Sequence, residues 1–246
     1  INGLHQDEFK SIISHEFGHF SQKTMKVGSY VYYVNEIIFN LLYDNELYQN
    51  TINKWGNISG FFGIFTYISS IIIEGIKWIL SKMYEIVNKS YLGLSREMEF
   101  HADQVASEIT GNTPVVTSLL RTSLIDHSLN EVLAVYDKKF SDNIKSNNIF
   151  KEQFFVMSFL SEKENIKTQN FLPHVTLNHL NRFNKSKLII KDQWSSHPST
   201  EERIEKLLTT NNTKSLNEKN RANELFSDIN STQIKITNKL FSNIPY

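Results

Sequence analysis

The sequence of 246 residues contains no cysteine, which excludes disulfide bonds and any metal site built on thiolates. It also has no excess charge of either sign, with 26 basic and 26 acidic residues. No broad basic surface is therefore expected, and nucleic acid is not an expected partner. A metal in this chain must be held by histidine and carboxylate side chains. The length suits one large domain or two small ones.

One short stretch has the right residues for such a site. His15, Glu16 and His19 form the pattern H-E-x-x-H, which is typical of zinc metallopeptidases. Residues four apart lie on one face of a helix, so His15 and His19 can point their imidazoles at one tetrahedral zinc ion. Glu16 lies beside them, where its carboxylate can take a proton from a water molecule in the fourth zinc position. A chance match is the alternative, so the motif needs support elsewhere in the chain.

The residues around this motif predict a helix over about residues 7–22. Asp7 is suited to cap its start, and Glu8 is suited to its first turn. Gly18 costs the helix about 1 kcal/mol relative to alanine, which is tolerable if another element packs closely against it. Apolar residues recur at three- and four-residue steps, and we expect this stripe to be buried. Its members are Phe9, Ile12, Ile13, Phe17 and Phe20.

A second stretch, residues 95–110, predicts a helix that Ser95 can begin and Gly111 can end. Glu99 and Asp103 are four residues apart on this helix, as a zinc site requires of a second helix. Glu99 would be the third zinc ligand. Asp103 would accept the free ring N–H of a zinc histidine, most naturally that of His15, and so fix its tautomer. The alternative is a pair of exposed helix acids, which most such pairs are.

A third stretch, residues 194–208, predicts a helix that Ser199 or Thr200 can cap. His197 precedes this helix, and Arg203 lies on its second turn. If they stand near the zinc, both side chains can stabilise the oxyanion of a tetrahedral intermediate and hold the substrate backbone. By itself, the stretch is also compatible with a surface His-Pro turn followed by a charged helix.

Residues 58–80 leave two alternatives open. A bilayer span needs about 20 mostly apolar residues, and this segment comes close, but Glu74 and Lys77 interrupt it. It is either a buried core helix or a helix embedded in or lying on a membrane. Residues 23–57 predict a buried or half-buried helix. A membrane span is not expected there, because the polar side chains would need partners in lipid. The C-terminal part, residues 113–246, predicts several helices joined by polar loops.

The three stretches, in this order, resemble the gluzincin family of zinc metallopeptidases that includes bacterial HtpX heat-shock proteases and CAAX prenyl endopeptidases. The matching segments are DEFKSIISHEFGHFSQ, SREMEFHAD and SSHPSTEERIEKL. The resemblance implies that Glu99, the glutamate of S-R-x-x-E-x-x-A-D, is the third zinc ligand, with Asp103 four residues on. It places the family's late histidine and arginine at His197 and Arg203. Members of the family often carry membrane helices between the first two segments.

The sequence begins Ile1-Asn2-Gly3, without methionine, and we interpret it as a fragment of a longer protein. Zinc peptidases usually bind substrate along an edge strand, and no candidate strand precedes Asp7. We expect that strand, and any signal or anchor, to lie upstream. The heavy use of Ile, Asn, Lys, Ser and Phe is typical of an AT-rich bacterial genome. His5, just before the predicted helix, is expected to be solvated.

The sequence therefore predicts a mainly α, zincin-type metallopeptidase domain over residues 1–246. We expect an endopeptidase with one zinc per chain and a peptide or protein as substrate, associated with a bacterial membrane or cytoplasmic. The predicted zinc ligands are His15, His19 and Glu99. The predicted catalytic residues are Glu16, His197 and Arg203, supported by Asp103.

Two other classes of protein remain as alternatives. One is a zinc-binding interaction module without proteolytic activity, for which Glu16 would have no purpose. The other is a membrane-associated helical scaffold in which residues 58–80 carry the function and the zinc motifs are relics. These alternatives differ in whether the chain binds metal and in whether it cleaves peptides.

Overall fold

The computed structural model describes residues 1–22, 25–43, 60–139, 142, 144–183, 197–210, 212 and 214–242, and the chain is mainly helical in these parts. The chain divides into two compact units, which we describe separately. Unit 1 comprises Ile1–His19, Phe100–Lys191 and Pro198–Tyr246, and unit 2 comprises Phe20–Glu99 and Asp192–His197. The predicted site residues of the first two stretches lie on α1 (Gln6–Ser21) and α4 (Gly60–Thr110).

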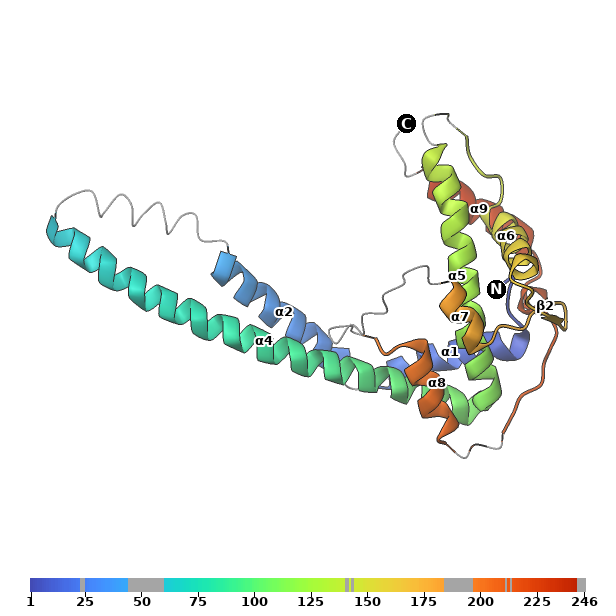
Figure 1. The fold of residues 1–246 in the computed structure, drawn as a ribbon, viewed down its shortest axis with the longest axis horizontal. Coiled ribbons are helices and arrows are strands. Elements are labelled where there is room, and N and C mark those ends of the chain that lie inside the picture. The colour runs from blue at the N-terminus through green and yellow to red at the C-terminus, as the bar shows by residue number, and fades with distance from the viewer. Residues whose placement is uncertain are drawn as a thin grey trace. The chain divides into compact units, whose positions relative to one another are not determined.

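Unit 1 is organised around α5 (Asn112–Lys138), with α6 and α9 on the same side of it in Figure 1. The helices that pack on α5 are α6 (Ile149–Lys163), α7 (Leu177–Phe183) and α8 (Thr200–Leu208). Unit 1 also contains most of α1, the end of α4 and a short antiparallel pair, β1 (Thr168–Gln169) and β2 (Leu172–Pro173). The 3-10 turn η2 (Ala222–Leu225) follows, and then α9 (Ile229–Ser242), which packs on α6.

The core of unit 1 joins these elements through one buried apolar cluster. Leu124 of α5, Met157 of α6 and Leu172 of β2 are almost completely buried in it, and Ile204 brings in α8. Full burial of a side chain of this size contributes roughly 1.5–3 kcal/mol. The cluster therefore holds α8, the helix of the third predicted stretch, firmly against α5.

The start of α1 is anchored to α5 by a buried network of charges. Glu8 is 0% exposed, and its Oε2 accepts a hydrogen bond from the backbone N–H of His5 at 2.9 Å and lies 3.2 Å from Nη1 of Arg121. Burial raises the pKa of Glu8, but hydrogen bonds from His5 and the charge of Arg121 outweigh it, so the net pKa is lowered. Asp7, equally buried, pairs with Lys219 at 2.7 Å. Removing one partner of such a pair costs about 3–5 kcal/mol, so the network fixes the position of α1.

This network corrects two predictions. The helix begins at Gln6, so Asp7 lies in its first turn and does not cap it. Instead, the carboxylate of Glu8 accepts the hydrogen bond from the backbone of His5 that precedes the helix. His5 is not solvated: it is buried, and its Nε2 lies 2.9 Å from the carbonyl oxygen of Asn170. A buried charged group requires hydrogen-bond partners. His5 provides its backbone N–H to Glu8 and its ring Nδ1 to Arg121.

The predicted apolar stripe of α1 is not its buried face. Phe17 and Phe20 are 64% and 73% exposed, whereas Ser11, Ser14 and Gly18 are buried. The reason is close packing, since Oγ of Ser11 lies 3.1 Å from Oγ of Ser118 on α5 and leaves no room for larger side chains. The helix is therefore held by small residues and paired charges.

The helix predicted over residues 95–110 is the last part of a longer one. α4 runs without interruption from Gly60 to Thr110, so Ser95 lies inside the helix and does not cap it. It ends at the predicted residue, Gly111, whose φ of +96° is a left-handed conformation that favours glycine. A Cβ at this position would collide with the carbonyl group of Lys214. α5 begins at the next residue, so one glycine separates the two helices.

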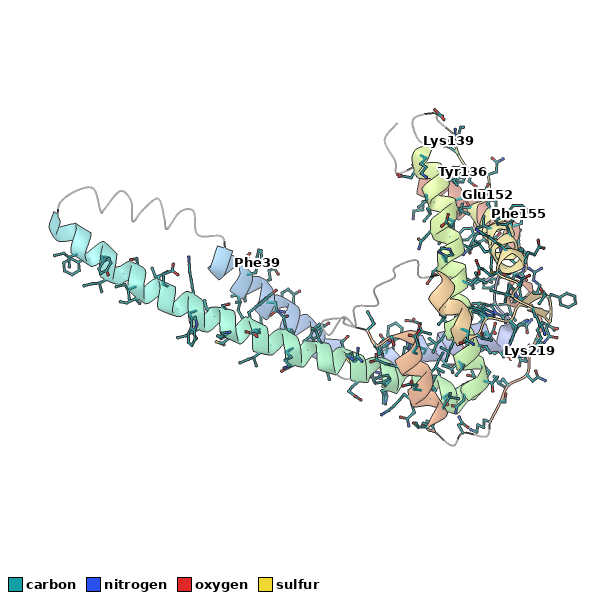
Figure 2. All side chains as sticks on the ribbon, viewed as in Figure 1. Phe39, Tyr136, Lys139, Glu152, Phe155 and Lys219 are labelled. Atoms are coloured by element: carbon teal, nitrogen blue, oxygen red, sulfur yellow. The ribbon has the colours of Figure 1, made fainter. Side chains whose placement is uncertain are left out.

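Unit 2 contains α2 (Met25–Tyr43) and the larger part of α4. Nδ2 of Asn35 donates a hydrogen bond to Oδ1 of Asn88, so the two helices lie side by side, and they run in opposite directions in Figure 1. Ile38 is buried, but Phe39, labelled in Figure 2, is exposed. The prediction of a buried or half-buried helix is thus met by part of α2; residues 44–57 lie outside the described chain.

The first part of α4 carries the apolar segment predicted over residues 58–80, of which 58 and 59 lie outside the described chain. Among the described residues, this helix is long and apolar enough to cross a membrane, and none of its apolar window is buried. Ile64, Ile71 and Trp78 are each more than half exposed. A core helix would bury such residues, so the described part of this segment does not have the burial expected of a core helix, and the membrane alternative stays a prediction.

Candidate metal centre

His15 and His19 stand one turn apart on α1, and their Nε2 atoms are 3.0 Å from each other. Two nitrogen ligands of a tetrahedral zinc, each at about 2.0–2.1 Å, lie about 3.3 Å apart. The two imidazole rings are perpendicular, with centroids 4.6 Å apart. The pair therefore already has the spacing that one shared metal ion requires.

Asp103 on α4 faces the other ring nitrogen of His15. Its Oδ1 lies 2.9 Å from Nδ1 of His15, and the Asp103 side chain is only 2% exposed. A carboxylate at this position accepts a hydrogen bond from Nδ1–H, which assigns the proton to Nδ1 and leaves the lone pair of Nε2 for a metal. The contact thus orients the His15 ring toward His19.

Arg203 on α8 holds Asp103 by two hydrogen bonds. Its Nε donates to Oδ2 at 2.7 Å, and its Nη2 donates to Oδ1 at 2.6 Å. Burial raises the pKa of Asp103, but hydrogen bonds from Arg203 and His15, together with the charge of Arg203, lower it further than burial raises it. Asp103 is therefore ionised at neutral pH, and a chain of contacts runs from α8 through α4 to α1.

Arg203 can reach Asp103 because α8 begins at a fixed residue. Oγ of Ser199 accepts from the backbone N–H of Glu202 at 3.2 Å, and the Glu202 carboxylate accepts from the backbone N–H of Ser199 at 3.0 Å. This reciprocal pair is a capping box, and it confirms Ser199 as one of the two predicted caps. The buried Ile204 and Leu207 fix the rotation of the helix.

Gly18, between the two histidines, packs closely against α4. A Cβ on Gly18 would lie 2.9 Å from Cα of Ala102 and 3.2 Å from its carbonyl oxygen. The prediction that another element packs closely against Gly18 is confirmed. Ala102 directly precedes Asp103, so this approach sets the distance between the histidine helix and the carboxylate.

Glu99 lies one turn before Asp103 on the same uninterrupted helix, so it projects from nearly the same face of α4. It is buried, and its Oε1 is 3.0 Å from Nδ1 of the exposed His197. Together with His15 and His19, it completes the predicted ligand set of two imidazoles and one carboxylate, which could hold a metal ion. These are the donor types that catalytic zinc sites use.

Glu16 is exposed and borders a pocket of about 330 Å³ together with His15. The pocket is lined by α1, α5, the start of α8 and Asp103 of α4, all in unit 1. A second pocket, of about 500 Å³, lies between α5 and α6, where Figure 2 labels Tyr136, Glu152 and Phe155. None of the predicted site residues lines that second pocket. The space beside the zinc motif is therefore the smaller one.

The two histidines, Glu16 and the acids of α4 stand out in the sequence as candidate site residues, whereas the pocket beside them does not. The wall that α5 contributes to it carries Ser118, Thr122 and Asp126, at steps of four residues. A polar stripe with helical spacing, inside a run otherwise rich in leucine and valine, was the available signal. Residues 194–196, the start of the third predicted stretch, lie outside the described chain.

A helical domain in which an H-E-x-x-H helix packs against a helix with a glutamate and an aspartate one turn apart is the arrangement of zincin-type metallopeptidases. The chain matches the family model of peptidase family M48 over residues 1–211, and it belongs to this family. Members are metallopeptidases that act on peptides or proteins and typically depend on zinc. Neither a curated protein nor a solved structure matches the chain.

We predict that Gly18→Ala weakens zinc binding at least tenfold. The added Cβ overlaps the backbone of Ala102, so α1 must move away from α4 and carry both histidines with it. Competition for zinc with a chromophoric chelator measures the affinity. The control is Gly93→Ala on α4. Nothing lies within 4 Å of a Cβ added there, so this substitution changes only the helix propensity. Equal zinc affinity in the two variants would contradict the close approach.

Proposed function

We propose that the chain is a zinc-dependent endopeptidase whose metal ligands are His15, His19 and Glu99. The observation that carries this proposal is that the Nε2 atoms of His15 and His19 are 3.0 Å apart, while the buried carboxylate of Asp103 contacts Nδ1 of His15. Zinc, when bound, supplies a Lewis acid that lowers the pKa of water toward about 7 and polarises a carbonyl group. The remaining chemistry belongs to the side chains of the protein.

Glu16 is the general base in this proposal. It follows His15 directly on α1, and it borders the pocket in which a substrate can lie. Its carboxylate takes the proton of the attacking water and later gives it to the amine that leaves. Exposure suits this role, because both water and the scissile peptide must reach the carboxylate.

Asp103 keeps His15 in the tautomer that presents Nε2 to the metal, and Arg203 keeps Asp103 charged and in place. This assignment rests on the bidentate contact between Arg203 and Asp103, which uses Nε and Nη2 of the guanidinium. Arg203 therefore acts through Asp103 in the proposal. Its stabilisation of an oxyanion or a substrate stays a prediction, as does the same role for His197.

The alternative of a zinc-binding module without proteolytic activity gives Glu16 no task. A structural zinc site is closed by four protein ligands, whereas this one offers two imidazoles and a carboxylate beside an open pocket. The position of Glu16 at that pocket favours catalysis. A peptidase and a zinc-binding module therefore differ in what happens when the Glu16 carboxylate is removed and the metal is kept: only the peptidase loses an activity.

We predict that Glu16→Gln lowers turnover of an unfolded protein substrate by about a thousandfold or more, because the proton acceptor is lost. Its zinc content should match that of the wild type, since Glu16 is not a ligand. Elemental analysis and cleavage of casein measure the two quantities. Glu205→Gln, an exposed acid on α8, is the control and should keep full activity. Retained turnover in zinc-loaded Glu16→Gln would refute the mechanism.

We also propose that the first part of α4 associates with a membrane. Many of its apolar side chains are exposed, among them Ile64, Ile72 and Trp78. The two charges that interrupt the segment, Glu74 and Lys77, stand one turn apart with 3.9 Å between their charged atoms. Pairing reduces the cost of placing both in or near a lipid phase.

We predict that the protein floats with zwitterionic phospholipid vesicles in a density gradient. Ile71→Asp combined with Ile72→Asp should reduce the floated fraction at least tenfold, because each charge at the centre of a span costs about 2.5–3.5 kcal/mol. The control is Ile109→Asp, which changes an exposed isoleucine of the same helix outside the apolar segment. Wild-type protein that stays with the aqueous fractions would contradict membrane association.

A further inference from the structure

The pocket beside Glu16 has walls that suit one long side chain. Ile12 of α1, together with Val115 and Leu119 of α5, gives it an apolar lining. The hydroxyl-bearing Thr122 and Ser123 follow along α5 in the same pocket. At about 330 Å³, it is at the small end of the range for ligand pockets. Apolar walls followed by polar groups suit a side chain with a methylene stem and a polar head.

The charges around this pocket do not cancel. Asp103 and Arg203 both line it, but they neutralise each other through their two hydrogen bonds. The acids left over are Glu16, which the proposed mechanism uses, and Asp126. Asp126 is therefore the acid of this lining that neither the ion pair nor the proposed mechanism uses, and it can attract a cationic group from outside.

Asp126, an exposed acid of α5, differs from the buried acids that anchor unit 1. Asp7, Glu8 and Asp103 each have a basic side chain within 3.2 Å. No hydrogen bond or ion pair to Asp126 is present in the described part of the chain. Partial burial raises the pKa of Asp126, and no neighbouring cation lowers it. A basic group would thus gain a carboxylate that has no competing partner among the described residues.

A further pocket, of about 430 Å³, continues from Asp126. It shares Ser123, Asp126 and Thr200 with the pocket beside Glu16, so Asp126 stands where the two meet. Its lining adds Glu201, in the first turn of α8, which also offsets the positive end of that helix. The lining of this further pocket therefore carries two acids, Asp126 and Glu201, beside His127.

We propose that this pocket is a specificity pocket that receives a lysine or arginine side chain next to the scissile bond, with Asp126 as its counter-ion. The inference rests on the proposed peptidase function and adds a substrate class to it, namely peptides with a basic residue beside the cleaved bond. The stem of the basic side chain packs against Ile12, Val115 and Leu119. Its charged head reaches Asp126.

A set of peptides with one cleavable bond tests this inference. Each position flanking the bond is varied in turn among lysine, arginine, alanine and glutamate, and kcat/KM is measured for the zinc-loaded full chain. We expect lysine or arginine to exceed alanine at least tenfold at one position. Asp126→Asn should reduce this ratio to near one, and Asp126→Lys should shift the preference to glutamate. Asp137→Asn, an exposed acid farther along α5, should keep the wild-type preference.

Binding of the same peptides to Glu16→Gln protein, followed by fluorescence anisotropy, gives a readout that does not depend on turnover. A preference for basic peptides that Asp126→Asn abolishes supports the pocket even if no peptide is cleaved, and in that case only the peptidase function fails. Cleavage without any basic preference, or a preference that survives in Asp126→Asn, overturns the specificity pocket and leaves the peptidase standing. Absence of both cleavage and selective binding overturns both.

Discussion

The contact between Asp103 and Nδ1 of His15, at 2.9 Å, is the interaction on which the site depends. It fixes which nitrogen of His15 faces His19, and it requires a buried charge. That charge is stable because Arg203 donates two hydrogen bonds to it, which in turn requires α8 to begin at Ser199. A capping box on one helix, an ion pair to a second and a histidine on a third thus form one continuous support.

The packing of α1 explains how His15 comes within hydrogen-bond distance of Asp103. Its buried face consists of small residues and paired charges, with Gly18 against Ala102 at one end and Glu8 against Arg121 at the other. Small residues let the helices approach closely enough for His15 to reach a carboxylate on α4. The larger apolar residues of α1 are consequently left on its exposed side.

The local features of the site could be predicted from the sequence, because spacing on a helix and capping depend on neighbouring residues. His15, Glu16 and His19 follow from helical periodicity, and Ser199 from capping chemistry. The buried face of α1 could not be predicted in this way, since its partners, Ala102 and Arg121, are about 100 residues away. The continuity of α4 was missed because Ser95 is a residue type that can begin a helix, although no proline interrupts residues 60–94. The pocket near Asp126 arises only when four helices pack together.

Metal content tests the central claim most directly, because the three ligands come from two separate segments of the chain. Elemental analysis of the wild-type protein after purification with zinc should give about one zinc per chain. Glu99→Ala should lose that zinc, whereas Glu97→Ala, an exposed acid on the same helix, should retain it. A folded wild type without zinc, or a Glu99→Ala variant with unchanged zinc content and affinity, would contradict the site described above.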